Sequence, residues 1–268
     1  MAEARLRAIV DAVCEAADHA LELWAGGATQ VKRWEKEPGQ PVCEADIAVN
    51  HMLHEALARI DAEAGWLSEE TADNPARLAA RRLWVVDPID GTKDYLAGRP
   101  GWSVSVALVE EGMPIVGVLA APARNELWVG RAGAGAERNG KPLRASGRRH
   151  LPGARVPAEK LPRMDEDLTT VHRPNSIALR MAMVAADEAD LVAGLRWGGE
   201  WDIAAAALIA SEAGASVSDA IGRPLIFNQP DPVTLGVLCC AAGIRDAAVE
   251  RLSERAMKVR AERELPPQ

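Results

Sequence analysis

The distribution of apolar side chains predicts two amphipathic helices near the N-terminus. In residues 1–25 the apolar positions recur at helical spacing, at Leu6, Ile9, Val10, Val13, Ala17 and Leu21. We expect this helix to end at Gly26 and Gly27. Residues 46–64 repeat the pattern at Val49, Met52, Leu53, Ala56, Leu57 and Ile60. Between the two helices, residues 28–45 are predicted to form a loop that carries Lys32, Arg33 and Lys36.

The middle of the chain is predicted to form strands. Apolar and β-branched runs at 83–87, 102–109 and 114–121 have the length and composition of strands. A short polar segment, residues 110–113, joins the last two as a hairpin, and residues 126–129 add a further strand. The stretch from 130 to 150 is rich in Gly and Arg and is predicted to be a loop with a turn at Asn139-Gly140.

The second half begins with an irregular segment, residues 150–170, and then alternates helices and strands. Helices are expected at 175–187, 202–213 and 244–262, and strands at 190–195, 215–219 and 235–241. The alternation predicts a mixed α/β (α+β) architecture. We expect two halves, residues 1–148 and 149–268, that pack into one compact unit.

Composition and charge exclude several classes of protein. The chain has 268 residues, 48% of them hydrophobic, and it lacks an apolar run of the roughly eighteen residues that a spanning helix needs. A net charge of −8 argues against binding to a nucleic-acid polymer or a membrane surface. No Cys-x-x-Cys pair occurs among Cys14, Cys43, Cys239 and Cys240, so we expect reduced thiols and a cytoplasmic location.

The predicted strand at 83–87 ends in two acids that are candidate metal ligands. Asp87 and Asp90 lie on a turn stiffened by Pro88, and their carboxylates could converge on one point. Such hard oxygen ligands suit Mg²⁺ or Ca²⁺, and the carbonyl of Ile89 lies between them as a further oxygen. The alternative interpretation is a surface turn with two solvated acids.

The residues that follow these acids offer a place for an anion. Gly91 and Thr92 present backbone N–H groups where a helix or turn begins, which is where phosphate binds in many proteins. An acidic protein that binds phosphate has to neutralise charge locally, and bound divalent cations would do so.

Three other segments carry acids that could join this site. Asp202 heads an alanine-rich helical stretch, Glu69 lies in the segment Leu-Ser-Glu-Glu, and Asp46 closes the segment Pro-Val-Cys-Glu-Ala-Asp. Each acid also has a simpler interpretation. Asp202 would favour the helix dipole, Glu69 would lie on a solvated face, and Asp46 would be an N-cap.

Taken together, these four segments resemble the inositol monophosphatase superfamily of metal-dependent phosphatases. Asp-Pro-Ile-Asp-Gly-Thr is similar to its central signature and Trp-Asp-x-Ala-Ala to its C-terminal one. The resemblance runs from about residue 36 to residue 243. It implies a layered αβαβα sandwich with the site between the two halves.

The resemblance also implies a ligand set and a mechanism. Glu69, Asp87 and the Ile89 carbonyl would hold one Mg²⁺, and Asp87, Asp90 and Asp202 a second, with a third bound more weakly through Glu69 and water. Mn²⁺ or Ca²⁺ could substitute. A metal-activated water would attack the phosphate, and the catalytic residues would be Glu69, Thr92 and Asp46. The N–H groups of Gly91 and Thr92 would bind the phosphoryl oxygens.

Further substrate contacts follow from the same resemblance. Ser176 lies in a segment similar to the family's Gly-Ser-x-Ala-Leu loop, in which Asn175 replaces the usual glycine. Arg180 could meet an anionic substrate or lie on the surface, and Lys36 matches a loop lysine that reaches the site in relatives. Cys43 and Glu44 depart from the family pattern beside Asp46 and put the local hydrogen bonds there in doubt.

Two local features favour a particular substrate. Ser68 before Glu69-Glu70 and Lys93-Asp94-Tyr95 after the signature resemble the 3′(2′),5′-bisphosphate nucleotidases of the CysQ type, whose substrate is 3′-phosphoadenosine 5′-phosphate. The alternatives are an inositol-1-monophosphatase, a related sugar or histidinol phosphatase, and a non-catalytic phospholigand-binding protein. The resemblance also implies inhibition by Li⁺ and a possible homodimer. Candidates for a second phosphate are Arg99, Arg173 and Arg180.

Overall fold

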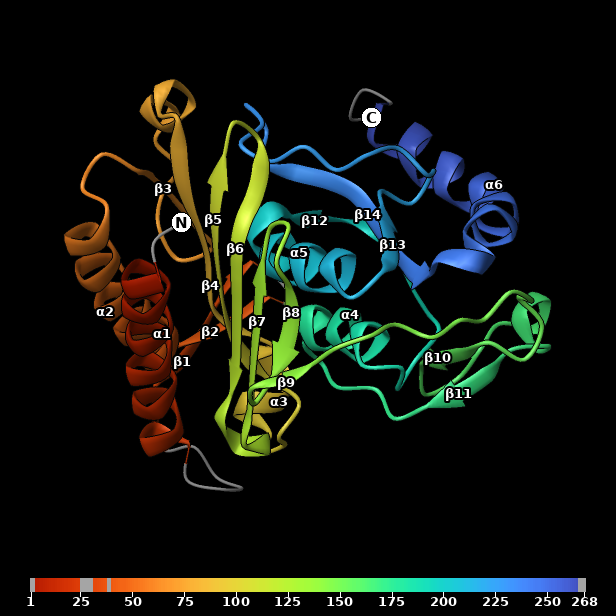
Figure 1. Cartoon of the computed structure of the whole chain (residues 1–268), viewed down its shortest axis with the longest axis horizontal. Coiled ribbons are helices and arrows are strands. Elements are labelled where there is room, and N and C mark those ends of the chain that lie inside the picture. Colours follow the sequence, from red (N-terminus) through yellow and green to blue (C-terminus); the bar gives the residue numbers. More distant parts are fainter. Residues whose placement is uncertain (1–2, 25–30, 38–39, 265–268) are drawn as a thin grey trace.

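The computed structural model describes residues 3–24, 31–37 and 40–264, and its centre is a seven-stranded sheet (Figure 1). The strand order is β3-β4-β5-β6-β7-β8-β9, parallel between β3 and β4 and antiparallel elsewhere. The strands are β3 (Gly65–Ser68), β4 (Arg82–Asp90), β5 (Ser103–Glu110), β6 (Met113–Ala121), β7 (Glu126–Arg131), β8 (Gly135–Arg138) and β9 (Lys141–Pro142).

Helices cover both faces of this sheet. On one face lie α1 (Glu3–Leu23) and α2 (Glu44–Ile60), and on the other α4 (Ile177–Ala185) and α5 (Ala204–Glu212) (Figure 1). Because both faces are covered, β4, β5 and β6 are buried along almost their whole length, as their continuous apolar runs predict.

A second sheet forms the next layer. It has the order β12-β14-β13, in which every pair is antiparallel. Its strands are β12 (Leu191–Gly199), β13 (Ala215–Ser218) and β14 (Val233–Ala241). The last helix, α6 (Arg245–Glu264), packs on its outer side (Figure 1). The layers therefore follow the order αβαβα, which confirms the fold that the resemblance implied.

The alanine-rich helix α5 packs unusually close to the central sheet. A Cβ atom added to Gly117 in β6 would lie 2.6 Å from the carbonyl oxygen of Ala205. Only small residues on both elements allow this approach. One apolar core joins strands β4 and β5, at Leu83 and Ala107, to the helices of the second half, at Ala182 and Ala205.

Two short hairpins were missed by the sequence analysis. The loop expected at 28–45 contains β1 (Arg33–Glu37) and β2 (Gln40–Cys43), which pair antiparallel. Residues 33–36 of β1 are exposed, and the buried side chains of Val42 and Cys43 in β2 are adjacent in sequence, so no apolar alternation marked the hairpin. The loop expected at 130–150 contains β8 and β9 around the predicted turn, where Asn139 and Gly140 have positive φ of 51° and 73°. The helix end expected at Gly26-Gly27 lies outside the described residues.

The segment 150–170 is also less irregular than expected. It contributes β10 (Arg155–Pro157), which pairs in parallel with β11 (Thr169–Val171), and a short 3₁₀ turn between them, η3 (Arg163–Asp165). The remaining helical elements are α3 (Thr92–Leu96) and the 3₁₀ turns η1 (Pro75–Ala79), η2 (Pro122–Arg124), η4 (Glu200–Asp202) and η5 (Ala242–Ile244). Within the described residues, none of the helices has both the length and the apolar character to cross a bilayer.

Candidate metal centre

Strand β4 delivers two carboxylates to one side through a bulge. Asp87 pairs with Ser105 of β5, and Asp90 pairs with Ser103, so three steps along β4 match two along β5. Residues three apart in a regular strand point to opposite faces, and one extra residue reverses that relation. Pro88, which has no N–H to donate to a ladder, lies within this bulge. The bulge explains how two acids at this spacing can face the same side of the sheet.

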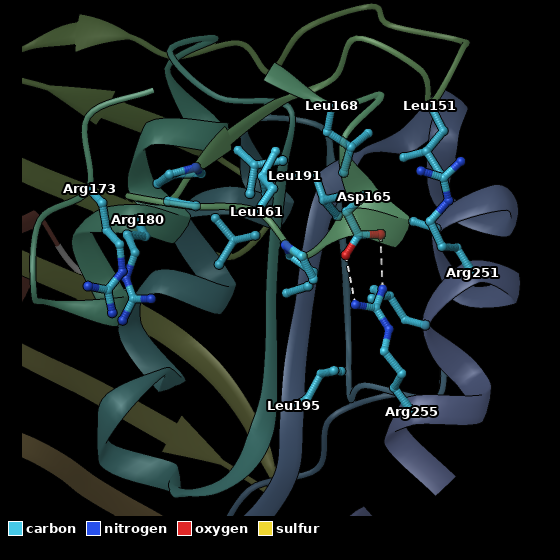
Figure 2. A pocket seen from close by; sticks show the side chains of 18 of the residues that line it. Leu151, Leu161, Asp165, Leu168, Arg173, Arg180, Leu191, Leu195, Arg251 and Arg255 are labelled. Carbon is cyan, nitrogen blue, oxygen red and sulfur yellow. Dashed lines mark hydrogen bonds and ion pairs between the residues drawn. The ribbon is translucent and has the colours of Figure 1, made fainter. Parts of the chain in front are cut away.

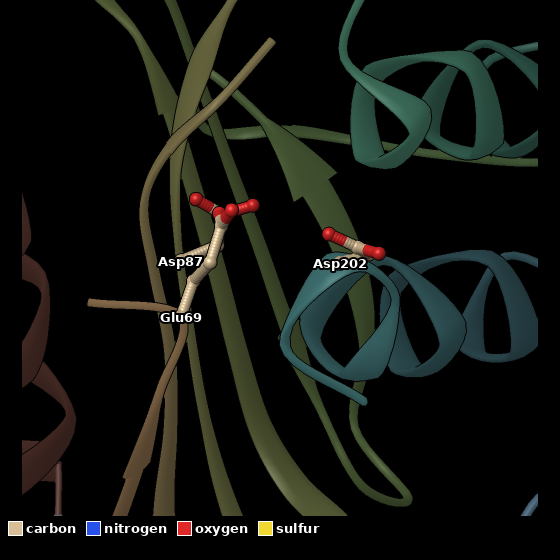
Figure 3. A group of neighbouring side chains, drawn as sticks. All are labelled: Glu69, Asp87 and Asp202. Atoms are coloured by element: carbon tan, nitrogen blue, oxygen red, sulfur yellow. The ribbon is translucent and has the colours of Figure 1, made fainter. Parts of the chain in front are cut away.

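Three acids from separate elements meet beside this bulge. Each of Glu69, Asp87 and Asp202 offers one carboxylate oxygen that lies within 4.8 Å of the other two. Figure 3 shows Glu69 and Asp87 side by side, with Asp202 facing them from the end of η4, just before α5. Glu69 follows β3 and donates its N–H to the Val86 carbonyl at 3.3 Å, and Asp202 accepts from the Gly199 N–H at 3.0 Å.

The electrostatics of this cluster favour a bound cation. Burial, followed by repulsion from Glu69, Asp90 and Asp202, raises the pKa of Asp87 well above its usual value. Burial and the same kind of repulsion raise the pKa of Asp202. None of the ion pairs in the described part of the chain involves Asp87, Asp90 or Asp202. Three neighbouring carboxylates without a paired side-chain cation suit a hard divalent ion.

Asp90 lies at the edge of this cluster and is held by the start of α4. Its Oδ2 accepts from Ser176 Oγ at 2.5 Å and from the Ala178 N–H at 2.7 Å, and its Oδ1 accepts from the Ile177 N–H at 3.2 Å. Burial raises the pKa of Asp90 to about 6, against the lowering effect of these hydrogen bonds. Each carboxylate oxygen retains acceptor capacity, so coordination of a metal by Asp90 stays a prediction.

Gly91, Thr92 and Ile89 form a tight corner directly after β4. Gly91 has φ of 98°, and a Cβ there would lie 2.7 Å from the Gly101 carbonyl oxygen, so only glycine fits. It precedes α3, whose first N–H groups have no partner within the helix. Thr92 Oγ1 donates to the Ile89 carbonyl at 3.0 Å and lies 3.5 Å from Asp46 Oδ1.

Asp46 is the third residue of α2 and not its N-cap. The N-cap is Cys43, whose N–H and Sγ donate to Asp46 Oδ2 at 2.8 and 2.9 Å, in a capping box. The N-cap interpretation of Asp46 is therefore wrong. Burial raises the pKa of Asp46 to about 6, although both bonds from Cys43 lower it. Cys43, which departs from the family pattern, therefore still provides hydrogen bonds to the Asp46 carboxylate. Glu44, the other departure, forms an exposed ion pair with Lys32.

Lys36 contacts the acidic cluster at Glu69 and the neighbouring Glu70. Its Nζ donates to Glu70 Oε1 and lies 3.3 Å from the Glu69 carbonyl oxygen and 3.5 Å from Glu69 Oε1. Burial raises the pKa of Glu70 to about 7, against the lowering effect of Lys36. Lys36 thus places a positive charge against the outer side of the candidate ligands.

A cavity of about 500 Å³ adjoins the cluster. Asp90 and Asp202 form one end of its wall, and Arg180 and Trp197 form other parts of it, with Arg173, Asn175 and Arg196. The analysis of the sequence did not single out Arg196, and it named Asp94 only as part of the segment Lys93-Asp94-Tyr95. Asp94 Oδ2 accepts from the Asn175 N–H at 3.0 Å and so holds the loop before Ser176. That segment gave no sign of the contact with Asn175, because the two residues are 81 positions apart in the chain.

The fold and the acidic cluster define a metal-dependent phosphatase of the layered α/β type. The chain belongs to the inositol monophosphatase family, whose model matches residues 3–258. Inositol monophosphatase 2 of Solanum lycopersicum is 33% identical over 264 residues, which cover 91% of this chain and 98% of that protein. The 3′(2′),5′-bisphosphate nucleotidase CysQ of Salmonella typhimurium is 32% identical over 238 residues, which cover 82% of this chain and 94% of that protein.

A solved structure shows the same relationship. The Thermotoga maritima IMPase superposes with a TM-score of 0.80 at 27% identity, covering 93% of this chain and 97% of that one. The predicted family resemblance is confirmed. Two relatives of nearly equal identity carry different substrate names, so the comparisons identify a phosphatase and leave its particular substrate open.

Proposed function

We propose that this protein is a Mg²⁺-dependent phosphomonoesterase that hydrolyses 3′-phosphoadenosine 5′-phosphate, as a 3′(2′),5′-bisphosphate nucleotidase. The observation that carries the phosphatase chemistry is the meeting of Glu69, Asp87 and Asp202 beside a cavity of about 500 Å³. An inositol-1-monophosphatase, or a related sugar or histidinol phosphatase, is the alternative. A second alternative is a protein that binds a phosphorylated ligand without catalysis.

The metal ligands in this proposal are five residues. Glu69, Asp87 and Asp202 supply the central oxygens, and Asp90 and the Ile89 carbonyl supply others for a set of two to three ions. Mn²⁺ or Ca²⁺ would fit the same oxygens. When bound, the metal neutralises phosphate charge and lowers the pKa of a water molecule. Lys36 offsets part of the remaining negative charge through Glu69 and Glu70.

Protein side chains orient and deprotonate the attacking water. In the reactive complex the Thr92 hydroxyl turns its hydrogen from the Ile89 carbonyl to Asp46 Oδ1, which is now 3.5 Å away. A lone pair of Thr92 Oγ1 then accepts a hydrogen bond from the water, and as the water loses its proton to Thr92, the hydroxyl proton of Thr92 passes to Asp46. Glu69 lies on the same side of the cluster and helps to hold that water. The N–H groups of Gly91 and Thr92, at the start of α3, bind the phosphoryl oxygens.

The substrate preference rests on sequence features and on the cavity. The Ser68 hydroxyl donates to Asn50 Oδ1 at 2.7 Å, and the Tyr95 hydroxyl donates to the Ala20 carbonyl at 2.9 Å. Neither residue lines the cavity, so neither is placed to contact the substrate there. The support for a bisphosphate comes instead from the arginines of the cavity wall, at 173, 180 and 196. These cations suit a substrate with more than one anionic group.

A substrate panel tests this proposal. We expect phosphate release from 3′-phosphoadenosine 5′-phosphate with a higher kcat/KM than from inositol 1-phosphate, histidinol phosphate or fructose 1,6-bisphosphate. Release should require Mg²⁺ and stop with EDTA. The Asp87→Asn variant is the matched control, because it removes one central charge and keeps the shape. Preference for inositol 1-phosphate would favour the alternative, and release from none would favour the binding protein.

Three properties of the family resemblance complete the proposal. We expect inhibition by Li⁺, a homodimer and a cytoplasmic location. Light scattering after size-exclusion chromatography measures the oligomeric state, and assays with added LiCl measure the inhibition.

A further inference from the structure

Two cavities meet at a pair of arginines. The cavity beside the metal centre and a second cavity of about 300 Å³ share Arg173, Arg180, Ala193 and Leu195 in their walls. The second cavity, here called the leucine-lined cavity, has six leucines among its nineteen lining residues. Figure 2 shows the guanidinium groups of Arg173 and Arg180 side by side at one end of it. The two arginines come from different elements. Arg173 follows β11, and Arg180 lies in α4.

Neither guanidinium is neutralised by a close carboxylate. Arg180 donates from Nε to the Ser176 carbonyl at 3.2 Å and from Nη2 to the Asn175 carbonyl at 3.1 Å, and no ion pair in the described part of the chain includes it. Arg173 has one long contact, 3.7 Å to the exposed Glu159. Both side chains therefore have N–H donors available for a ligand.

The other two arginines of the second cavity, and Arg99, are already paired. Arg255, at the far end of the leucine-lined cavity, donates two hydrogen bonds to Asp165 (Figure 2). Arg251, at the same end, donates two to Asp167. Arg99 donates to Asp94 at 2.8 and 2.6 Å, its side chain is 63% exposed, and it lines neither cavity. Of the three candidates for a second phosphate, Arg99 is therefore already paired with a carboxylate, whereas Arg173 and Arg180 have no close carboxylate partner.

The two positive charges of Arg173 and Arg180 favour the binding of a dianion. Burial, followed by the neighbouring charge of Arg173, lowers the pKa of Arg180 to about 10. Two like charges in a partly desolvated wall repel each other until an anion binds between them. A phosphate group offers two negative charges and oxygens that match guanidinium donors in pairs.

We propose that Arg173 and Arg180 bind a second, non-reacting phosphate of the substrate while its scissile phosphate lies at Glu69, Asp87 and Asp202. This inference rests on the proposed phosphatase function and assigns the residues that distinguish a bisphosphate from a monophosphate. Arg173 is the specificity-determining residue of the pair. Arg180 has a second task, because its bonds to Asn175 and Ser176 hold the loop that contacts Asp90.

The experiment uses the Arg173→Gln variant and matched substrate pairs. The first pair is 3′-phosphoadenosine 5′-phosphate and 3′-AMP, and the second is inositol 1,4-bisphosphate and inositol 1-phosphate. A charged hydrogen bond contributes about 1.5–3 kcal/mol, so kcat/KM for the preferred bisphosphate should fall roughly 10- to 100-fold. The value for its monophosphate should change less than about threefold, because that substrate lacks the group that Arg173 binds.

Two further variants keep the result specific. Arg173→Lys retains the charge and should recover part of the loss, whereas Arg251→Gln, in the far wall of the same cavity, should leave both substrates unaffected. Equal losses on the two members of a pair, or no loss on either, would overturn the assignment. The same holds if the native enzyme prefers the bisphosphate in neither pair.

The experiment distinguishes failure of the arginine site from failure of the proposed nucleotidase function. If the native protein hydrolyses inositol bisphosphate and not the nucleotide, the nucleotidase proposal fails while the arginine site is still supported by the Arg173→Gln loss. If it hydrolyses none of the four compounds, calorimetric binding of the same compounds decides. A bisphosphate that binds the native protein more tightly than the variant supports the site, and equal binding rejects it.

Discussion

Ser176 Oγ donates to Asp90 Oδ2 at 2.5 Å and joins two segments that lie 86 residues apart in the chain. One is the end of β4, which carries the metal-ligand candidates, and the other is the N-cap of α4, which borders the substrate cavity. The Ile177 and Ala178 N–H groups add to the same carboxylate. One side chain, Asp90, therefore fixes the position of the candidate metal centre relative to the cavity wall.

The first prediction concerns Asp90→Asn. The amide oxygen can keep the bonds to Ser176 and Ala178, but the negative charge beside Asp87 and Asp202 is lost. We expect kcat/KM to fall on the order of a hundredfold, by analogy with groups that support metal sites, while the fold stays largely intact. Steady-state kinetics and circular dichroism measure the two effects.

Ser176→Ala is the matched control for that variant. It keeps the charge of Asp90 and removes one hydrogen bond and the N-cap of α4, where Leu179 N–H donates to Ser176 Oγ at 2.9 Å. We expect a loss of about 1 kcal/mol in stability and a much smaller loss of activity. Near-normal turnover of Asp90→Asn would contradict the assignment of two metals.

The second prediction is that removing an acid from the cluster stabilises the metal-free protein. Asp202→Asn relieves repulsion with Asp90 and Glu69, and its amide oxygen can still accept from Gly199. We expect the metal-free Tm to rise by about 2–4 °C for each kcal/mol gained, and the increase in Tm caused by Mg²⁺ to shrink. Differential scanning calorimetry with and without Mg²⁺ measures both.

A buried acid outside the cluster provides the comparison. Asp219 accepts from Arg223 Nε at 2.7 Å and from two backbone N–H groups, so Asp219→Asn should lower the Tm and leave the Mg²⁺ response intact. If Asp202→Asn behaved in the same way as Asp219→Asn, the acids at 69, 87 and 202 would not share a metal.

The sequence was informative about the site because each acid lies in a short local pattern. Asp87 and Asp90 are marked by the change from an apolar strand to Pro, Gly and Thr, and Asp202 by the alanines that follow it. How they meet could not be derived locally. The bulge in β4 depends on its pairing with β5, and the position of Asp202 depends on the packing of α5 against Gly117.

The elements that the sequence did not reveal are held by polar contacts. Strand β10 is fixed because Asp190 accepts from the N–H and the side chain of Arg155. Cys43 was recognised only as a departure from the family pattern, although it caps α2 and contacts Asp46. Hydrogen bonds between residues distant in sequence leave no periodic signal, whereas the apolar faces of α2, β5 and β6 do.

The third prediction concerns pH and metal affinity. The carboxyl groups of Asp87 and Asp202 have raised pKa values, and that of Asp90 is raised to about 6, so the metal-free cluster retains protons above the usual carboxyl range. Mg²⁺ must displace these protons. We expect its apparent affinity to increase from pH 5.5 to pH 8, with proton release that calorimetry in buffers of different ionisation enthalpy can count.

The same raised pKa values fix the sign of the effect on stability. A carboxyl group whose pKa is raised in the folded state favours folding at low pH, and that contribution is lost as the pH rises through the folded pKa. For Asp90 this contribution should fall as the pH rises from 3.8 to about 6 and be absent above that. The increase in Tm caused by Mg²⁺ should therefore be larger at pH 8 than at pH 5.5. An affinity for Mg²⁺ that is independent of pH would contradict the protonated cluster.

The fourth prediction is that Cys43 sets the pH at which Asp46 becomes active. Burial raises the pKa of Asp46 to about 6, and the Cys43 N–H and Sγ bonds oppose that rise. Burial also raises the pKa of the Cys43 thiol to about 12, so the thiol stays protonated and donates throughout the assay range. Removing this donor with Cys43→Ala should raise the pKa of Asp46 further.

Because Asp46 is proposed to act as a carboxylate, its higher pKa would move the acidic limb of the kcat/KM profile to higher pH. The profile should be measured from pH 5 to pH 8 at saturating Mg²⁺, so that metal affinity does not contribute. Cys43→Ser restores a side-chain donor and should move the limb back. A residue that only fills space would lower kcat/KM equally at every pH, since the loss of Sγ leaves a small cavity. An unshifted limb in Cys43→Ala would show that the Sγ bond to Asp46 does not tune this carboxylate.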